Sequence, residues 1–229
     1  MKTVGIIGGL GPVTTSEFYL KLIFTCQEIK KTNRPPILIY SVPISYEVEE
    51  TAIANGQGEE KCIPLLLDAA QKLEKAGADF LVMPCNSLHA FINEIRDSVK
   101  IPVLSIVEET AKFLKKERIE KVGIIATSIT VTKKLYENPL IDNGISQIKP
   151  DDFQQAKIGK IIYNLVSNKQ SNKDREDLLK IIDDFESRGV GHVVLACTDL
   201  QLLIPHHPKL KIYDTMEIFS DATARIILS

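Results

Sequence analysis

Long apolar runs, signal-like segments and paired cysteines are all missing from this sequence. No run approaches the roughly 18 apolar residues that a membrane-spanning helix needs. Residues 1–9 enter a buried-looking strand at once, without the charged, apolar and cleavage regions of a secretory signal. No C-x-x-C pair is present, which argues against a zinc ribbon or a disulfide framework. We therefore expect a cytoplasmic protein with no membrane partner and with reduced thiols at Cys26, Cys62, Cys85 and Cys197.

An excess of either charge is missing as well. Lys and Arg together number 28 and Asp and Glu number 30, a formal net charge of −2. A nucleic-acid-binding protein normally carries a basic excess or stripe, so we expect no nucleic-acid partner. Hydrophobic residues make up 44% of the 229 residues and charged residues 25%, which indicates a folded chain with a buried core. This length predicts one large domain or two small ones.

What the sequence does contain is an alternation of short apolar strands and amphipathic helices. We expect strands at 3–7, 37–41, 79–83, 103–106, 121–126, 192–196 and 211–213. Helical periodicity covers 14–31, 59–75, 106–116, 174–187 and 217–228. Short strands rich in Val and Ile that alternate with helices predict an α/β fold with parallel sheets covered on both faces.

Two halves of the sequence resemble each other. The matching pairs of segments are 4–7 with 122–125, 77–88 with 189–200, and 101–105 with 210–214. The matches are in order and about 110 residues apart, which indicates an internal repeat. The alternative is that generic parallel strands look alike. Against it, each half carries a cysteine just after a strand and just before a helix.

The repeat predicts two pseudo-symmetric α/β domains, each a parallel sheet flanked by helices, with the active site in the cleft between them. Repeated α/β pairs often exchange their final element. We therefore expect the last strand and helix, 211–228, to return to the first half. The predicted domains are residues 1–103 with 213–229, and residues 104–212.

Cys85 and Cys197 are the strongest candidates for chemistry. Each follows an apolar strand, and parallel α/β sheets bind ligands beyond the carboxyl ends of their strands. Each also precedes a helical segment, whose N-terminal N–H groups are expected to lower the thiol pKa. An isolated cysteine is more often a small buried hydrophobic residue. A matched pair at equivalent strand ends favours function instead.

Pseudo-twofold symmetry would place these two thiols on opposite sides of one substrate. Such a pair fits a two-base proton transfer, in which one thiolate removes a proton from a carbon acid and the opposite thiol returns one to the other face. This reaction inverts a stereocentre. A disulfide would need the two Cβ atoms within about 4.5 Å, and the spacing in the sequence neither supports nor excludes it.

The loops after the first strand of each half are further candidates. Gly9 and Gly11 fit the pattern G-x-G-x-x-G, but Thr14 stands at the third glycine, so no dinucleotide site is expected. Gly9 and Leu10 are expected to let the backbone approach a small ligand, with a plain tight turn as the alternative. The hydroxyl-rich loop 126–130 is a candidate for contacting a substrate carboxylate or amine, with ordinary helix capping as its alternative.

A histidine close to the first cysteine raises the question of a metal. His89 lies four residues after Cys85, so a C-x-x-x-H metal pair has to be considered. No other His or Cys cluster is near in the sequence. A structural role for His89 is therefore favoured, and no metal is expected.

Four segments make a family resemblance visible. Residues 8–12, 83–89, 124–127 and 196–200 resemble the aspartate/glutamate racemase family, and the resemblance covers essentially the whole chain. It implies two pseudo-symmetric α/β domains with the active site between them. It also implies an isomerase that needs neither pyridoxal phosphate nor a metal, so we expect no cofactor. Family members are commonly homodimers, and we expect a homodimer here.

The resemblance also implies roles for single residues. Cys85 and Cys197 would act as acid and base on opposite faces of the substrate Cα. The side chains beside them would hold the α-carboxylate and the α-amino group of an amino acid, and the loop after the first strand of the second half would line the same pocket. The implied binding residues are Asn86, Ser87, Thr198 and Thr127.

Departures from the family pattern bear on the substrate. Aspartate-specific members carry an arginine in the loop after the second strand, and Glu50 aligns with it here. A lysine that such members use in the second domain aligns with Ser167. An acidic residue would repel a substrate carboxylate. The segments 35–43, 196–200 and 212–214 instead resemble the broad-specificity amino-acid racemase subgroup, which accepts basic amino acids such as lysine, ornithine and arginine.

The sequence therefore predicts a cofactor-independent racemase that interconverts L- and D-amino acids, acting on aspartate and glutamate or on a broader set that includes basic amino acids. Three alternatives stay open. The first is a related decarboxylase or cis–trans isomerase of the same fold. The second is a two-lobed small-molecule binding protein without turnover. The third is a thiol–disulfide redox protein.

Overall fold

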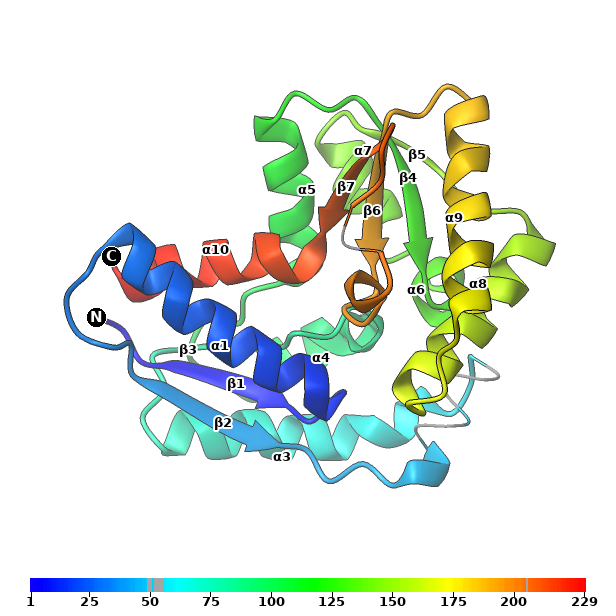
Figure 1. The fold of residues 1–229 in the computed structure, drawn as a ribbon. Helices are drawn as coiled ribbons and strands as arrows, with labels where there is room; N and C mark the ends of the chain where they lie inside the picture. Colours follow the sequence, from blue (N-terminus) through cyan, green and yellow to red (C-terminus); the bar gives the residue numbers. More distant parts are fainter. Residues whose placement is uncertain (49–50, 52–55, 205) are drawn as a thin grey trace.

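The computed structural model describes residues 1–48, 51, 56–204 and 206–229, and its strands form two separate parallel sheets (Figure 1). The first sheet has the order β2–β1–β3, from β1 (Val4–Gly8), β2 (Ile37–Ser41) and β3 (Phe80–Val82). The second has the order β5–β4–β6–β7, from β4 (Lys121–Ala126), β5 (Ser146–Ile148), β6 (His192–Ala196) and β7 (Lys211–Asp214). The predicted α/β fold with two parallel sheets is confirmed.

Helices cover both sheets. In Figure 1, α1 and α10 lie on one face of the first sheet and α3 lies on the other. The α-helices are α1 (Pro12–Ile29), α3 (Ile63–Lys75), α4 (Ile92–Ser98), α5 (Ile106–Lys116), α6 (Ser128–Thr132), α7 (Glu137–Asp142), α8 (Asp152–Val166), α9 (Asn172–Ser187) and α10 (Thr215–Ile227). Short 3₁₀ segments are η1 (Glu59–Cys62), η2 (Ser87–Phe91) and η3 (Leu200–Leu202). Among the described residues, no helix is long and apolar enough to cross a membrane.

Several helix starts follow from local sequence. Pro12 begins α1, where its missing N–H leaves no hydrogen bond unmade. Pro64 lies in the first turn of α3 and divides the predicted helix 59–75 into η1 and α3. Asp151 and Ser171 begin α8 and α9 with capping boxes, in which each side chain accepts a backbone N–H three residues on.

The repeat seen in the sequence is also a repeat in packing. The first strand of each sheet carries a glycine where a covering helix comes close. A Cβ on Gly5 of β1 would lie 3.2 Å from Cβ of Leu73 in α3 and 2.6 Å from Cδ2 of Leu81. A Cβ on Gly123 of β4 would lie 2.9 Å from Cγ of Phe185 in α9. In both sheets the absence of a side chain on this glycine therefore allows a helix to pack closely: α3 on β1 and α9 on β4.

The helix that ends each repeat packs against the other half. Phe113 of α5 stacks edge-on against Tyr213 of β7, with ring centroids 6.0 Å apart. Phe219 of α10 lies 5.7 Å from Phe18 of α1, measured between ring centroids. Figure 1 shows the same exchange, with red α10 alongside blue α1 and green α5 beside β7. One core cluster consequently contains strand residues of both sheets.

The last strand does not return to the first half, and that expectation was wrong. β7 pairs in parallel with β6, so only α10 crosses to the first half. The edge of the first sheet that β7 would have needed is taken by Val103, which bridges to Leu81. The predicted strand 103–106 is reduced to this bridge because α5 already begins at Ile106. The division into 1–103 with 213–229 and 104–212 stays a prediction.

Candidate active site

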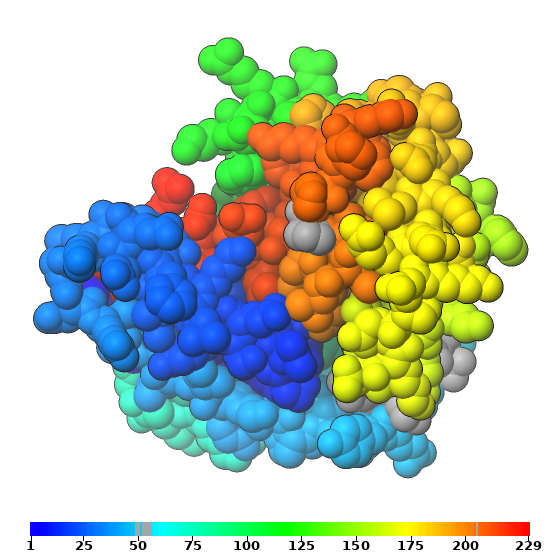
Figure 2. Space-filling model, in the orientation of Figure 1, coloured from blue at the N-terminus to red at the C-terminus, as the bar shows by residue number. Residues whose placement is uncertain are grey.

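A pocket lies beyond the carboxyl ends of the central strands, between the two sheets. It occupies about 710 Å³ including its open mouth. In Figure 2, blue residues of the first half meet orange and yellow residues of the second half across one face of the molecule. The pocket is lined by Leu10, Gly11, Ile44, Cys62, Cys85, Asn86, Ser87, Leu88, Thr127, Ile129, Ile162, Val166, Cys197, Thr198 and Asp199.

Most residues that the sequence singled out line this one pocket, although they come from four separate segments. Leu10 follows β1, Thr127 follows β4, and the two cysteine segments follow β3 and β6. The predicted residues in the lining are Leu10, Cys85, Asn86, Ser87, Thr127, Cys197 and Thr198. The parallel topology brings them together because the carboxyl ends of the strands of both sheets point toward the same space.

Among the described residues, Gly9 is the predicted residue that is not in the lining. Gly9 has a φ of +81°, and its N–H donates to Oγ1 of Thr15 at 2.9 Å. A Cβ there would lie 2.7 Å from Oγ of Ser41, so Gly9 shapes the turn behind the pocket. Gly11 reaches the lining in its place. Glu50 lies outside the described residues, and its role in substrate recognition stays a prediction.

The residue directly after each cysteine binds the opposite half. Nδ2 of Asn86 donates to Oγ1 of Thr215 at 3.0 Å, and Oη of Tyr136 donates to Oδ1 of Asn86 at 2.5 Å. Oγ1 of Thr198 donates to the carbonyl of Pro84 at 3.4 Å. These side chains are all buried, so their hydrogen bonds fix the distance between the two cysteine segments.

The second residue after each cysteine also makes a hydrogen bond to the opposite half. Here the two halves carry different functional groups. Ser87 Oγ lies 2.7 Å from Thr127 Oγ1. The equivalent position in the other half is Asp199, whose Oδ1 accepts a hydrogen bond from Thr14 Oγ1 at 2.6 Å. One side of the pocket therefore carries a hydroxyl where the other carries a carboxyl.

Burial controls the electrostatics of the two thiols. Desolvation raises the pKa of Cys85 to about 12, against a smaller opposing effect of hydrogen bonding from the Leu88 backbone. Desolvation also raises the pKa of Cys197 well above its ordinary value, and the Asp199 carboxylate raises it further. The backbone N–H groups after each cysteine lower the thiol pKa as expected, but desolvation outweighs them, so the expected net lowering does not occur. The segments that follow are the short 3₁₀ turns η2 and η3, whose dipoles are too small to offset desolvation.

Asp199 is the polar group of the site that the sequence analysis left out. Its Oδ2 lies 3.9 Å from Sγ of Cys197, which donates to it, and burial raises the pKa of its carboxyl. The signal was present in the repeat, because Asp199 stands two residues after its cysteine just as Ser87 does.

His89 has the structural role that the sequence favours. Its Nε2 accepts a hydrogen bond from the N–H of Ile106 at 3.1 Å, which leaves Nδ1–H to donate to the carbonyl of Cys85 at 2.6 Å. Both ring nitrogens are thus occupied, and the ring ties the first cysteine segment to the start of α5. In the described part of the chain, no three His, Cys, Asp or Glu side chains gather to hold a metal ion.

This buried histidine predicts a loss of stability in acid. Desolvation lowers the pKa of His89 from 6.5 to about 4, so as the pH falls below 6.5 the unfolded chain takes up a proton that the folded chain refuses. Stability is complete above this range and should decrease by about 3 kcal/mol on reaching pH 4. Urea unfolding of wild type and His89→Gln at several pH values measures the effect.

The variant should show the shallower dependence on pH, whatever its stability at neutral pH. His206→Gln is the matched control, because His206 is exposed. A His89→Gln variant that loses as much stability in acid as the wild type does would contradict this assignment.

Comparison with known proteins adds an independent line of argument. The sequence profile of the Asp/Glu/Hydantoin racemase family matches residues 7–223. A curated relative is the broad specificity amino-acid racemase RacX of Bacillus subtilis (strain 168), 29% identical over 99% of this chain and 98% of the relative.

Solved structures agree with the sequence comparison. A candidate Asp/Glu racemase from Yersinia pestis superimposes with a TM-score of 0.87 at 29% identity, with 100% of both chains covered. The aspartate racemase of Picrophilus torridus gives a TM-score of 0.82 at 25% identity and covers 99% of this chain and 94% of that one. The pseudo-symmetric arrangement of two parallel sheets is therefore shared with these proteins.

Proposed function

Because this chain belongs to the Asp/Glu/hydantoin racemase family and is an isomerase of the racemase type, we propose that it interconverts L- and D-amino acids by proton transfer at Cα. The proposed acid and base are Cys85 and Cys197. One observation carries the proposal: two thiols from equivalent strand ends of opposite sheets line the same pocket. The thiols supply both proton transfers, so the proposed reaction needs no cofactor.

The proposed step conserves its protons. One thiolate takes the proton from Cα, and the electron pair of the broken C–H bond moves into the α-carboxylate. The opposite thiol then gives its proton to the other face of Cα, and its sulfur is left as the thiolate. The amino acid leaves with inverted configuration, and the two cysteines have exchanged protonation states.

The developing negative charge needs hydrogen-bond donors close to the carboxylate. Ser87 and Thr127 share one hydrogen bond, so the proposed donor is the hydroxyl hydrogen that this bond leaves over. Thr198, whose hydroxyl donates to the Pro84 carbonyl, is proposed to accept a hydrogen bond from the α-ammonium group. Asn86 is proposed to contribute the amide hydrogen of Nδ2 that its bond to Thr215 leaves over. Its remaining bonds would keep the two thiols at a fixed separation.

The substrate is also proposed to help ionise the thiols. Burial raises the pKa of both thiols, which favours their neutral forms in the unliganded pocket. An α-ammonium group bound between them would bring in a positive charge, which favours a thiolate. The thiolate would then form where its substrate is already in place.

We propose that the two thiols differ in acidity, because the Cys197 thiol donates a hydrogen bond to the Asp199 carboxylate. Removing the charge of Asp199 in Asp199→Asn is expected to lower the pKa of Cys197, because a neighbouring carboxylate disfavours the thiolate. Alkylation of Cys197 by iodoacetamide at fixed pH should therefore become faster, with each site followed by mass spectrometry. Asp214→Asn is the control, since Asp214 caps α10 and instead binds Met216. An unchanged rate at Cys197 in Asp199→Asn would contradict this.

The function is tested by proton NMR in D₂O with purified protein and no added cofactor. L-amino acids with acidic, basic and apolar side chains are supplied separately, and the loss of each Cα–H signal is followed. Chiral chromatography then identifies the D-isomer. The expected result is exchange accompanied by inversion for at least one amino acid.

The alternatives predict other outcomes of the same experiment. A decarboxylase of this fold would release carbon dioxide and give a new product signal. A binding protein without turnover would broaden substrate signals without exchange. Failure of every amino acid to exchange would therefore overturn the racemase proposal for this pocket.

We also propose that the protein is a homodimer, as the family resemblance implies. In support, α1 exposes the apolar side chains Val13, Leu20 and Phe24 on its outer surface. Light scattering after size-exclusion chromatography measures the mass directly. The cytoplasmic location expected from the sequence stays a prediction.

A further inference from the structure

The walls of the pocket are of two kinds. Polar groups gather around Cys85 and Cys197, whereas the rest of the described lining, apart from Gly11 and Cys62, is aliphatic. Ile162 and Val166 lie one turn apart on α8, Ile129 belongs to α6, and Ile44 follows β2. We call this aliphatic lining the apolar wall; it consists of Leu10, Ile44, Leu88, Ile129, Ile162 and Val166.

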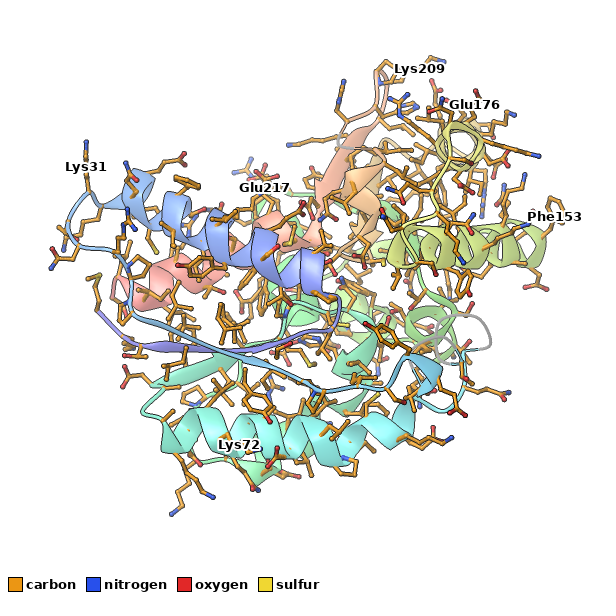
Figure 3. All side chains as sticks on the ribbon, turned by 60° about the horizontal axis from the view of Figure 1, so that its bottom comes forward. Lys31, Lys72, Phe153, Glu176, Lys209 and Glu217 are labelled. Carbon is orange, nitrogen blue, oxygen red and sulfur yellow. The ribbon has the colours of Figure 1, made fainter. Side chains whose placement is uncertain are left out.

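Among the described residues, positive charge is missing from the lining of the pocket. Within the part of the chain that the structure describes, no Lys, Arg or His lines it. Lys133, which follows α6, is paired with the buried Glu59 at 2.9 Å. The ionisable groups in the lining are thiols and the Asp199 carboxyl. The exposed charged residues Lys31, Lys72, Glu176, Lys209 and Glu217 extend outward in Figure 3.

These surroundings discriminate between substrate side chains. A side-chain carboxylate against the apolar wall would lose its water without gaining a counter-ion, and this desolvation weakens the binding affinity. An aliphatic side chain in the same place gains about fourfold for each methylene group that leaves water. The apolar wall therefore favours uncharged aliphatic side chains over side chains that carry a carboxylate.

We propose that the preferred substrates are neutral amino acids with aliphatic side chains, of the size of leucine, methionine or norleucine, whose side chains bind the apolar wall. This inference rests on the proposed racemase function and adds the substrate class to it. The α-carboxylate and α-ammonium remain among the polar groups beside the thiols, and only the side chain points to the wall.

The test compares kcat/KM for exchange at Cα between substrates that differ in one property. Leucine and aspartate have side chains of nearly equal shape, so their comparison isolates charge. Leucine should exceed aspartate by about 100-fold or more, as expected for an unpaired carboxylate in an apolar site. Norleucine and lysine share a stem, and norleucine should be the better substrate.

A homologous series tests the contact with the wall itself. From 2-aminobutyrate to norvaline to norleucine, kcat/KM should rise about fourfold with each added methylene. A flat series, an aspartate that matches leucine, or a lysine that exceeds norleucine would overturn the inference and leave the racemase function intact. Absence of exchange with every amino acid would instead overturn the function on which it rests.

A charged variant tests the position of the wall. Val166 lines the pocket and is half-buried, so an arginine there can keep water when no substrate is bound. In Val166→Arg, the ratio of kcat/KM for aspartate to that for leucine should rise by about tenfold or more. Phe153→Arg, at the exposed outer end of α8 (Figure 3), is the matched control and should leave the ratio unchanged. Equal ratios in the two variants would contradict the proposed position.

Discussion

Replacing Cys85 or Cys197 by alanine is expected to reduce racemisation by about a thousandfold or more, because each variant lacks one of the two proton-transferring groups. The structural cost should be small. Each thiol lies at the end of a strand, facing a pocket, and the hydrogen bonds between the halves are made by the residues that follow it. Chiral chromatography measures the rate of inversion, and circular dichroism the melting temperature.

Exchange of the Cα–H in D₂O, measured on the same two variants, distinguishes the roles of the two thiols. Each remaining cysteine still faces the Cα–H of one enantiomer, from which it can remove a proton and return deuterium to the same face. One variant should therefore exchange the Cα–H of the L-isomer only, and the other that of the D-isomer only, both without inversion. Cys26→Ala is the control, because Cys26 lies in the core away from the pocket. Wild-type racemisation after loss of either pocket thiol would refute the two-base assignment.

The largest expected effect on stability lies far from the thiols, where Phe185 packs on Gly123. Phe185 is 1% exposed, and its truncation in Phe185→Ala should lower the free energy of unfolding by about 3–5 kcal/mol. Gly123→Ala should cost about 1–3 kcal/mol, because its Cβ would lie within 3.1 Å of three ring atoms. Urea unfolding monitored by circular dichroism measures both changes.

The double variant makes this prediction specific. With the ring removed by Phe185→Ala, adding Gly123→Ala should cost nothing further, so the two effects should not add. Gly191→Ala is the matched control, because a Cβ there would meet no atom within 4 Å, and it should change stability by less than about 0.5 kcal/mol. Additive effects of the two substitutions would show that the close approach of α9 to β4 is not what limits residue 123.

The elements with the strongest sequence patterns were predictable. β2, β4, β6 and α5 begin and end at the predicted residues, since each is a continuous apolar run or a clear amphipathic period. The strand β5 escaped because Ser146–Ile148 is a short, mostly polar edge strand that gains its structure from pairing with β4. The helix α8 escaped although Asp151 and Gln154 form a capping box at its start.

The site was predictable to the extent that it follows from topology. Strand ends of a parallel sheet gather ligand-binding residues, so Cys85 and Cys197 could be placed at one pocket from their positions alone. The thiol pKa could not be predicted in the same way, because it depends on how closely the two halves cover the sulfur atoms. The apolar wall could not be predicted either, because two of its residues, Ile162 and Val166, belong to α8, a helix that the sequence pattern did not reveal.

The exchange of α5 and α10 between the halves has a consequence for the order of folding during synthesis. A chain folds from its N-terminus as it emerges from the ribosome. The strands of the first sheet are complete once residue 82 has emerged, but the α10 side chain Phe219 that packs against Phe18 is made more than a hundred residues later. Until then the nascent first half exposes apolar surface that no segment yet synthesised can cover. The first half to be made therefore cannot complete its native packing before the end of the second half has been synthesised.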